Sequence, residues 1–223
     1  MPSEVSTETD EDHHFPAPFR SASVRRHGRS TRTLGLIDMR TSVFAIAALC
    51  SSLSFAQGVS NTPQADQQAN AAARLFMDAC AANLGDEPKL KGWIRENRLR
   101  PTDPGFSQKV LQGQPGEVWS ATSQVGDFLV VVGSPYRCAV WARRADAPLA
   151  VEHFQRLIKG VERPGLSVNL AKDQEFQGQG GKYRQVAYIL KKQGATAGWA
   201  MLATVSESPT AEVQVRFTVS AAK

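Results

Sequence analysis

A short apolar run near the N-terminus divides this chain of 223 residues into a part expected to be removed and a part that folds. The run, Val43–Phe55, follows a basic start, and the small residues Ser54 and Ala56 precede Gln57. A charged start, a short apolar segment and a small-residue cleavage site are typical of a secretory signal peptide. We therefore expect residues 39–56 to be a signal peptide, which would make the mature protein periplasmic or secreted.

A retained membrane anchor is the alternative interpretation of the same run. A transmembrane helix needs about 20 predominantly apolar residues. Val43–Phe55 is shorter than that, and a polar stretch follows it directly. We therefore interpret residues 57–68 as a polar tether and expect no stable membrane span once the leader has been cleaved.

The first 38 residues have a composition that does not support a folded core. They are acidic at first and basic afterwards, with few apolar side chains. Such a segment buries too little apolar surface to offset the entropy of ordering it. We predict that residues 1–38 are a disordered or mis-annotated extension, and both Met1 and Met39 remain possible starts.

The composition of the mature chain excludes several classes of function. From Gln57 onward, the chain has 20 lysines and arginines and 15 acidic residues, and the basic residues are spread along the chain. A surplus of that size is ordinary for solubility, so we expect no nucleic-acid partner. His153 is the one histidine of this part. We predict no metal site, because too few His and Cys ligands are present, and no cofactor. Carboxylates are plentiful, but the sequence does not show which of them the fold brings together, so we name no catalytic residue.

The hydrophobic pattern predicts helices first and strands later. Helical periodicity covers Ala69–Leu84, a second short helix opens at Asp86–Pro88, and Phe106–Leu111 can form another turn of helix. A further helix is predicted over Leu149–Val161, after Pro148.

Seven segments have the composition of strands and are separated by turn residues. Together with the helices they predict an α+β fold, with residues 69–223 forming a single domain. We expect an antiparallel sheet of about seven strands, covered on one side by the N-terminal helices and the one central helix. The predicted strands are Glu117–Ser123, Asp127–Val132, Arg137–Arg143, Leu166–Phe176, Tyr183–Lys191, Trp199–Ser206 and Glu212–Val219.

Two cysteines remain after the leader is removed, and the pattern predicts that they pair. Cys80 shares a helix face with Phe76, and Cys138 alternates in phase with Val140, so both point to the core. An even count in an oxidising compartment favours a disulfide. The alternative is two separate buried thiols.

A pair of arginines closes the third predicted strand. Arg143 and Arg144 precede the helix at Pro148 and form a candidate anion-binding site, because guanidinium groups suit carboxylate and phosphate. Neighbouring residues in a strand point to opposite faces, so the two can serve one ligand only if the strand has already ended. The alternative is a solvated end of a strand.

Four short segments together resemble an uncharacterised family of small exported bacterial proteins, some of which are lipid-anchored. The segments are Phe76–Cys80, Val118–Ala121, Cys138–Asp146 and Arg163–Leu166. The chain lacks the lipobox cysteine of anchored members, so the resemblance implies a soluble periplasmic or secreted form. It implies no activity.

The leading functional hypothesis is an exported, non-enzymatic envelope protein that binds a protein partner or a small envelope ligand. The alternative is a periplasmic hydrolase that uses carboxylates which the sequence does not identify. A concave pocket with perturbed carboxylates would favour the enzyme. A flat apolar patch or an open sheet edge would favour partner binding.

Overall fold

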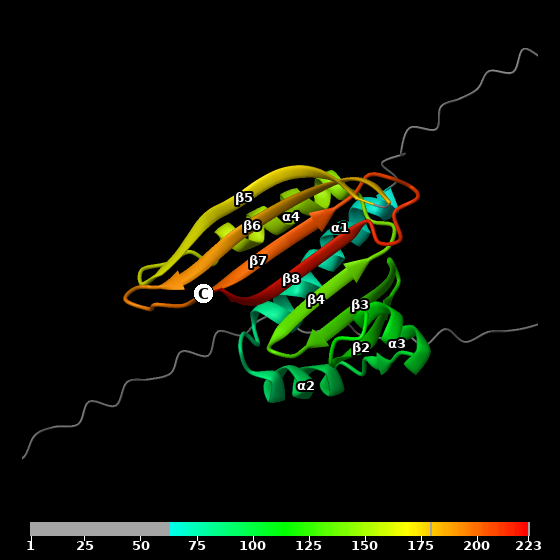
Figure 1. The fold of residues 1–223 in the computed structure, drawn as a ribbon, viewed down its shortest axis with the longest axis horizontal. Coiled ribbons are helices and arrows are strands. Elements are labelled where there is room, and N and C mark those ends of the chain that lie inside the picture. Colours follow the sequence, from blue (N-terminus) through cyan, green and yellow to red (C-terminus); the bar gives the residue numbers. More distant parts are fainter. Residues whose placement is uncertain (1–62, 179, 223) are drawn as a thin grey trace, which may run out of the picture.

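The computed structural model describes residues 63–178 and 180–222 (Figure 1). The predicted leader, the extension before it and the first part of the tether lie outside these residues. The helical elements of the described part are α1 (Pro63–Phe76), a π-helical turn η1 (Met77–Ala81), α2 (Glu87–Glu96), α3 (Pro104–Leu111) and α4 (Ala147–Lys159). The strands are β1 (Arg100–Pro101), β2 (Gly116–Ser123), β3 (Gly126–Gly133), β4 (Arg137–Ala142), β5 (Leu166–Gly178), β6 (Gly181–Lys192), β7 (Gly198–Val205) and β8 (Val215–Ala222).

All the strands join one sheet in the order β1-β2-β3-β4-β8-β7-β6-β5. Every pair of neighbours is antiparallel. The last strand of the chain, β8, therefore lies in the middle of the sheet and joins β4 to the β5–β6–β7 meander. This arrangement confirms the predicted α+β class with an antiparallel sheet. The eighth strand, β1, was not predicted because two residues are too few to show a period of alternation.

Aspartates start three of the helices. Asp86, Asp103 and Asp146 each accept a hydrogen bond from the backbone N–H three residues later, over 2.9, 3.0 and 2.9 Å. A proline occupies the first turn of each of these helices. An acidic cap satisfies a backbone donor that the helix leaves unpaired, and proline has no N–H to lose there.

The main core lies between one face of the sheet and the helices α1 and α4. Figure 1 shows both helices running behind the strands β4, β8, β7 and β6. Phe76 of α1, Phe154 of α4 and Phe217 of β8 are buried together, with ring centroids 5.3–6.0 Å apart. Burying aromatic rings of this size is a large part of what holds the three elements together.

Helix α3 packs against the opposite face of the sheet. Val110 and Leu111 of α3 contact a small cluster formed by Val118, Val131 and Ala139. The expectation that helices cover one side therefore holds for α1 and α4 but not for α3. The reason is local, because α3 directly precedes β2 and folds back over it.

Several element boundaries differ from those predicted, those of α1 and β8 among them. Helix α1 begins at Pro63, so it includes part of the predicted tether, whose polar residues lie on its exposed side. Strand β8 begins at Val215 rather than Glu212, because the segment before it turns back and Gln214 accepts a hydrogen bond from the N–H of Ser206 at 2.8 Å.

The predicted cysteine pair is joined in the core. Cys80, in η1, and Cys138, in β4, form a disulfide with their Cα atoms 5.4 Å apart, and both are fully buried. The bond ties the end of the first helical segment to the centre of the sheet.

Tyr136 secures the same region with a hydrogen bond. Its hydroxyl donates to the carbonyl oxygen of Asn83 at 2.6 Å, and its ring lies edge-on to Trp199 with centroids 5.5 Å apart. Burial raises the pKa of Tyr136 to about 12, so the hydroxyl keeps its proton and acts as a donor at neutral pH.

We predict that reducing the Cys80–Cys138 bond destabilises the folded domain. The two cysteines are 58 positions apart, and closing such a loop restricts the unfolded chain by about 4 kcal/mol in the entropy model. Chemical denaturation with and without reductant measures the difference in unfolding free energy. Equal values would contradict the prediction.

We predict that Tyr136→Phe lowers the unfolding free energy by about 1–2 kcal/mol, because the carbonyl of Asn83 loses its donor. Tyr188→Phe is the matched control. Tyr188 is buried, but no hydrogen bond of its hydroxyl is found within the described residues. The prediction fails if the two variants are equally stable.

Candidate functional site

A surface cavity lies between the end of β4 and the start of α4. It has a volume of about 700 Å³. One wall is the connection between β4 and α4, and the other is the segment between β7 and β8. The lining residues are Ala65, Arg143, Arg144, Ala145, Asp146, Ala147, Pro148, Ser206, Glu207, Pro209, Thr210, Ala211, Glu212 and Gln214.

Both predicted arginines line this cavity. Strand β4 ends at Ala142, so Arg143 and Arg144 lie in the connection that follows and are not bound to the alternation of a strand. Both side chains are exposed. The structure thus meets the condition under which one ligand could contact both residues. Their role in binding an anion stays a prediction.

Carboxylates share the cavity with the arginines. Asp146 is buried and already accepts the N–H of Leu149 as a helix cap. Glu207 and Glu212, from the opposite wall, are exposed and form no ion pair with either arginine in the described part of the chain. The cavity therefore carries both signs of charge, and a ligand with a single negative group would also meet two glutamates.

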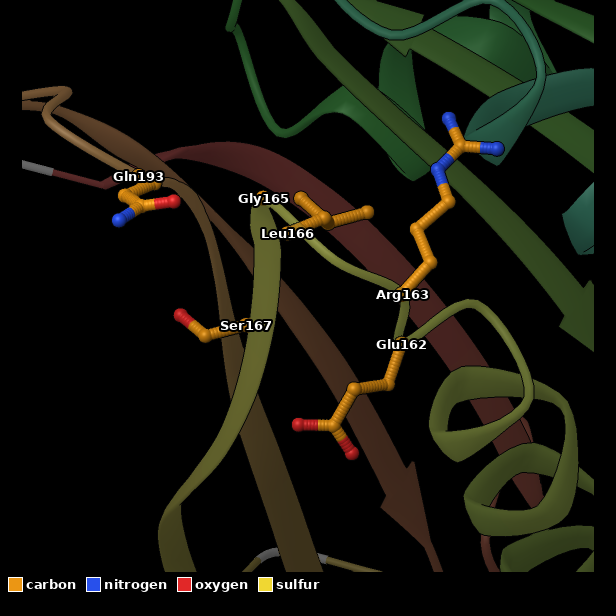
Figure 2. A pocket seen from close by; sticks show the side chains of 6 residues that line it. All are labelled: Glu162, Arg163, Gly165, Leu166, Ser167 and Gln193. Carbon is orange, nitrogen blue, oxygen red and sulfur yellow. The ribbon is translucent and has the colours of Figure 1, made fainter.

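A smaller cavity, of about 340 Å³, lies between the end of α4 and the turn that joins β6 to β7. Figure 2 shows that the side chains of Glu162 and Arg163 point in opposite directions, while Ser167 and Gln193 lie at its rim. These polar groups do not converge on a common point. The arrangement gives no basis for naming it a binding site.

Strand β5 forms one edge of the sheet. It pairs with β6 from Leu166↔Lys192 to Gly178↔Gly181, with a shift of register between Leu170 and Lys172, and lies at the end of the strand order. Leu166 also bridges to Arg163 of the preceding turn, and the rest of β5 has no second neighbour within the described residues. With 13 residues it is longer than the mode for strands in globular proteins, about five or six. A long edge presents a row of unpaired backbone N–H and C=O groups.

The side chains of β5 are exposed as well. Leu170 and Phe176 are two of the three large apolar residues exposed in the described chain, at 56% and 38%. Phe176 stacks on Tyr183 of β6 with centroids 5.6 Å apart. The sequence did not indicate which strand would lie at the edge, although a strand that is polar on both faces, such as the run at residues 172–175, is a usable signal.

Ion pairs hold the exposed hairpin of β5 and β6 together. Arg184 donates two hydrogen bonds to Asp173, over 2.9 and 2.8 Å, and Lys182 pairs with Glu175 at 2.6 Å. The contact with Arg184 lowers the pKa of Asp173. The hairpin, residues 166–192, has five cationic and two acidic residues, so it is basic as a whole, while β5 itself contains Lys172 and both acidic residues.

The described residues contain no group of three or more His, Cys, Asp or Glu side chains placed to hold a metal ion. His153 of α4 pairs with Asp66 of α1, with Nε2 and Oδ1 3.2 Å apart. The sequence did not predict this contact, because the two residues are 87 positions apart. No helix among the described residues is long and apolar enough to cross a membrane.

We predict that replacing both Arg143 and Arg144 by Ala abolishes binding of an acidic partner. The domain should stay folded, because no described hydrogen bond of the core depends on their side chains. Titration with inorganic phosphate, followed by NMR shifts of residues 143–147, is the measurement. Replacing Lys89 and Lys109, which lie on other helices, is the control. If phosphate causes the same NMR shifts in the double Arg variant as in the wild type, the arginines bind no anion and are only solvated.

Comparison of the chain with protein-family models and with curated proteins finds no match.

Proposed function

We propose that this chain is an exported, non-enzymatic binding protein that captures an extended segment of a protein partner along the free edge of β5. The observation that carries the proposal is the length of that edge: β5 has 13 residues, and after Leu166, which bridges to Arg163, they pair on one side only in the described chain. In β-strand addition, backbone hydrogen bonds supply affinity, and contacts to alternate side chains supply specificity.

Export is supported by the apolar leader in the sequence and by the buried Cys80–Cys138 disulfide. Disulfides persist in oxidising compartments and are rare in the cytosol. Both features together support a periplasmic or secreted location.

The chemistry of the partner follows from the net charge of the β5–β6 hairpin. Two copies of a basic hairpin repel each other when their edges meet, whereas an acidic segment is attracted. Leu170 and Phe176 are available for apolar contacts on the two sides of the added strand. The partner segment is therefore extended, net acidic and apolar at one or two positions.

The test combines a photo-crosslinking residue with proline substitution. The crosslinker is placed at Leu170 and, as a matched control, at Phe106, which is also an exposed apolar residue but lies on α3. After irradiation in envelope extract, we predict an adduct from position 170 and none from position 106.

Gln174→Pro and Glu175→Pro then test whether the edge is responsible. Alternate residues of an edge strand point their N–H outward, so one of these variants removes a free edge donor and the other a donor of the β5–β6 ladder. The variant that keeps the wild-type melting temperature should lose the adduct. An adduct that persists in this variant would overturn the proposal, and an adduct of two copies of this chain would assign the edge to self-association.

A further inference from the structure

The face of the sheet opposite α1 and α4 is a second surface that has no described element over most of its width. In Figure 1 the strands β4, β8, β7, β6 and β5 lie in front of those helices, and α3 lies beside β2. The strand register identifies the residues of this face. Core residues of neighbouring strands pair with one another, so the residues that alternate with them pair on the opposite face. They lie in rows that cross the strands, such as Arg137–Ser220–Ala200–Ile189–Asn169 and Trp141–Arg216–Thr204–Gln185–Gln174.

The charges on this face have one sign. Arg137, Arg216, Lys191 and Lys172 point to it from four different strands, and all four are exposed. Among the described residues of these five strands, no Asp or Glu shares the face. The acidic residues of the β5–β6 hairpin, Asp173 and Glu175, lie on the other side in register with Val186 and Arg184.

Two of the cations are close enough to act on each other. The guanidinium of Arg216 lies 4.1 Å from the ring centroid of Trp141. Partial burial lowers the pKa of Arg216, Tyr183 acts to raise it, and the charge of Arg137 lowers it further. Glu212, in the segment before β8, acts in the opposite direction. Arginine nevertheless stays charged at neutral pH, so the two positive groups favour an anion between or above them.

The spacing of the cations requires a long ligand. Arg137 on β4 and Lys191 on β6 are separated by three gaps between strands, as are Arg216 on β8 and Lys172 on β5. At about 4.8 Å per gap, each pair spans about 14 Å. A single small anion cannot bridge that distance, whereas a polymer with repeated negative groups can.

The side chains between the cations are mainly small or polar. Thr218, Ser220, Thr204 and Gln185 lie on this face, together with the half-buried Leu202 and Ile189. The amide of Gln185 donates to the hydroxyl of Thr204 at 3.4 Å. Of the three large exposed apolar residues, Phe176 is the only one on this face, where it stacks on Tyr183. Hydroxyls, amides and an aromatic ledge suit the hydroxyl groups and C–H faces of sugars, while a lipid surface or a protein core contact would require more exposed apolar area.

We propose that the open face of strands β4, β8, β7, β6 and β5 binds a polyanionic glycan, with Arg137, Arg216, Lys191 and Lys172 contacting its acidic groups. This site is separate from the free backbone edge of β5 and does not depend on the partner proposed for it.

The test uses calorimetric titration of the mature protein with polygalacturonate. The double variant Arg137→Gln with Lys191→Gln should bind at least about tenfold more weakly than the wild type. The control double variant, Lys89→Gln with Lys159→Gln, removes the same charge from α2 and α4 and should bind as the wild type does. Both variants should keep the wild-type melting temperature, because these side chains are exposed. If the face pair proves unstable, Lys191→Gln alone against Lys159→Gln gives the same comparison.

Two further polymers decide the chemical class of the ligand. Neutral dextran should not bind, and poly-L-glutamate should bind more weakly than polygalacturonate. Equal loss in the face and control variants would overturn the proposal, because binding would then follow net charge alone. Equal affinity for poly-L-glutamate would overturn the assignment to a glycan, and binding of dextran would overturn the role of charge.

Discussion

The packing of α1 and α4 against one face of the sheet decides which surfaces of this protein are left for binding. Phe76, Phe154 and Phe217 join the two helices to β8 at the centre of the sheet, and the Cys80–Cys138 bond fixes the end of α1 to β4. Because both helices lie on the same side, the opposite face keeps only α3, at the β2 end. The sheet therefore continues to β5 with one free face and one free edge.

These two surfaces offer different chemistry to a ligand. The edge of β5 offers backbone donors and acceptors to any extended chain, and its side chains adjust the preference. The open face offers side chains only, since its backbone groups are used by neighbouring strands, and its selectivity depends on Arg137 and the other cations. Both surfaces are basic, yet one suits a polypeptide and the other suits a charged polymer with many hydroxyl groups.

The sequence predicted the parts of the fold that depend on local periodicity. Strong alternation located the longer strands, and the paired phases of Cys80 and Cys138 predicted their bond. The sequence did not predict contacts between distant segments. The pairing of β8 with β4 and the edge position of β5 depend on how the whole sheet is ordered. Arg143 and Arg144 were predicted as a pair, but the glutamates opposite them come from the β7–β8 segment, which no local pattern places there.

Amide hydrogen exchange of β5, resolved residue by residue, tests most directly whether its edge is free and can accept a strand. In the protein alone, we predict that inward amides of residues 167–178 exchange slowly and outward amides exchange fast, with a break in the alternation at the register shift between Leu170 and Lys172. With envelope extract added, the fast amides should become protected, while those of β4 and β8, which lie inside the sheet, should not change. Uniform slow exchange along β5 in the protein alone, or outward amides that stay fast in the extract, would contradict the account.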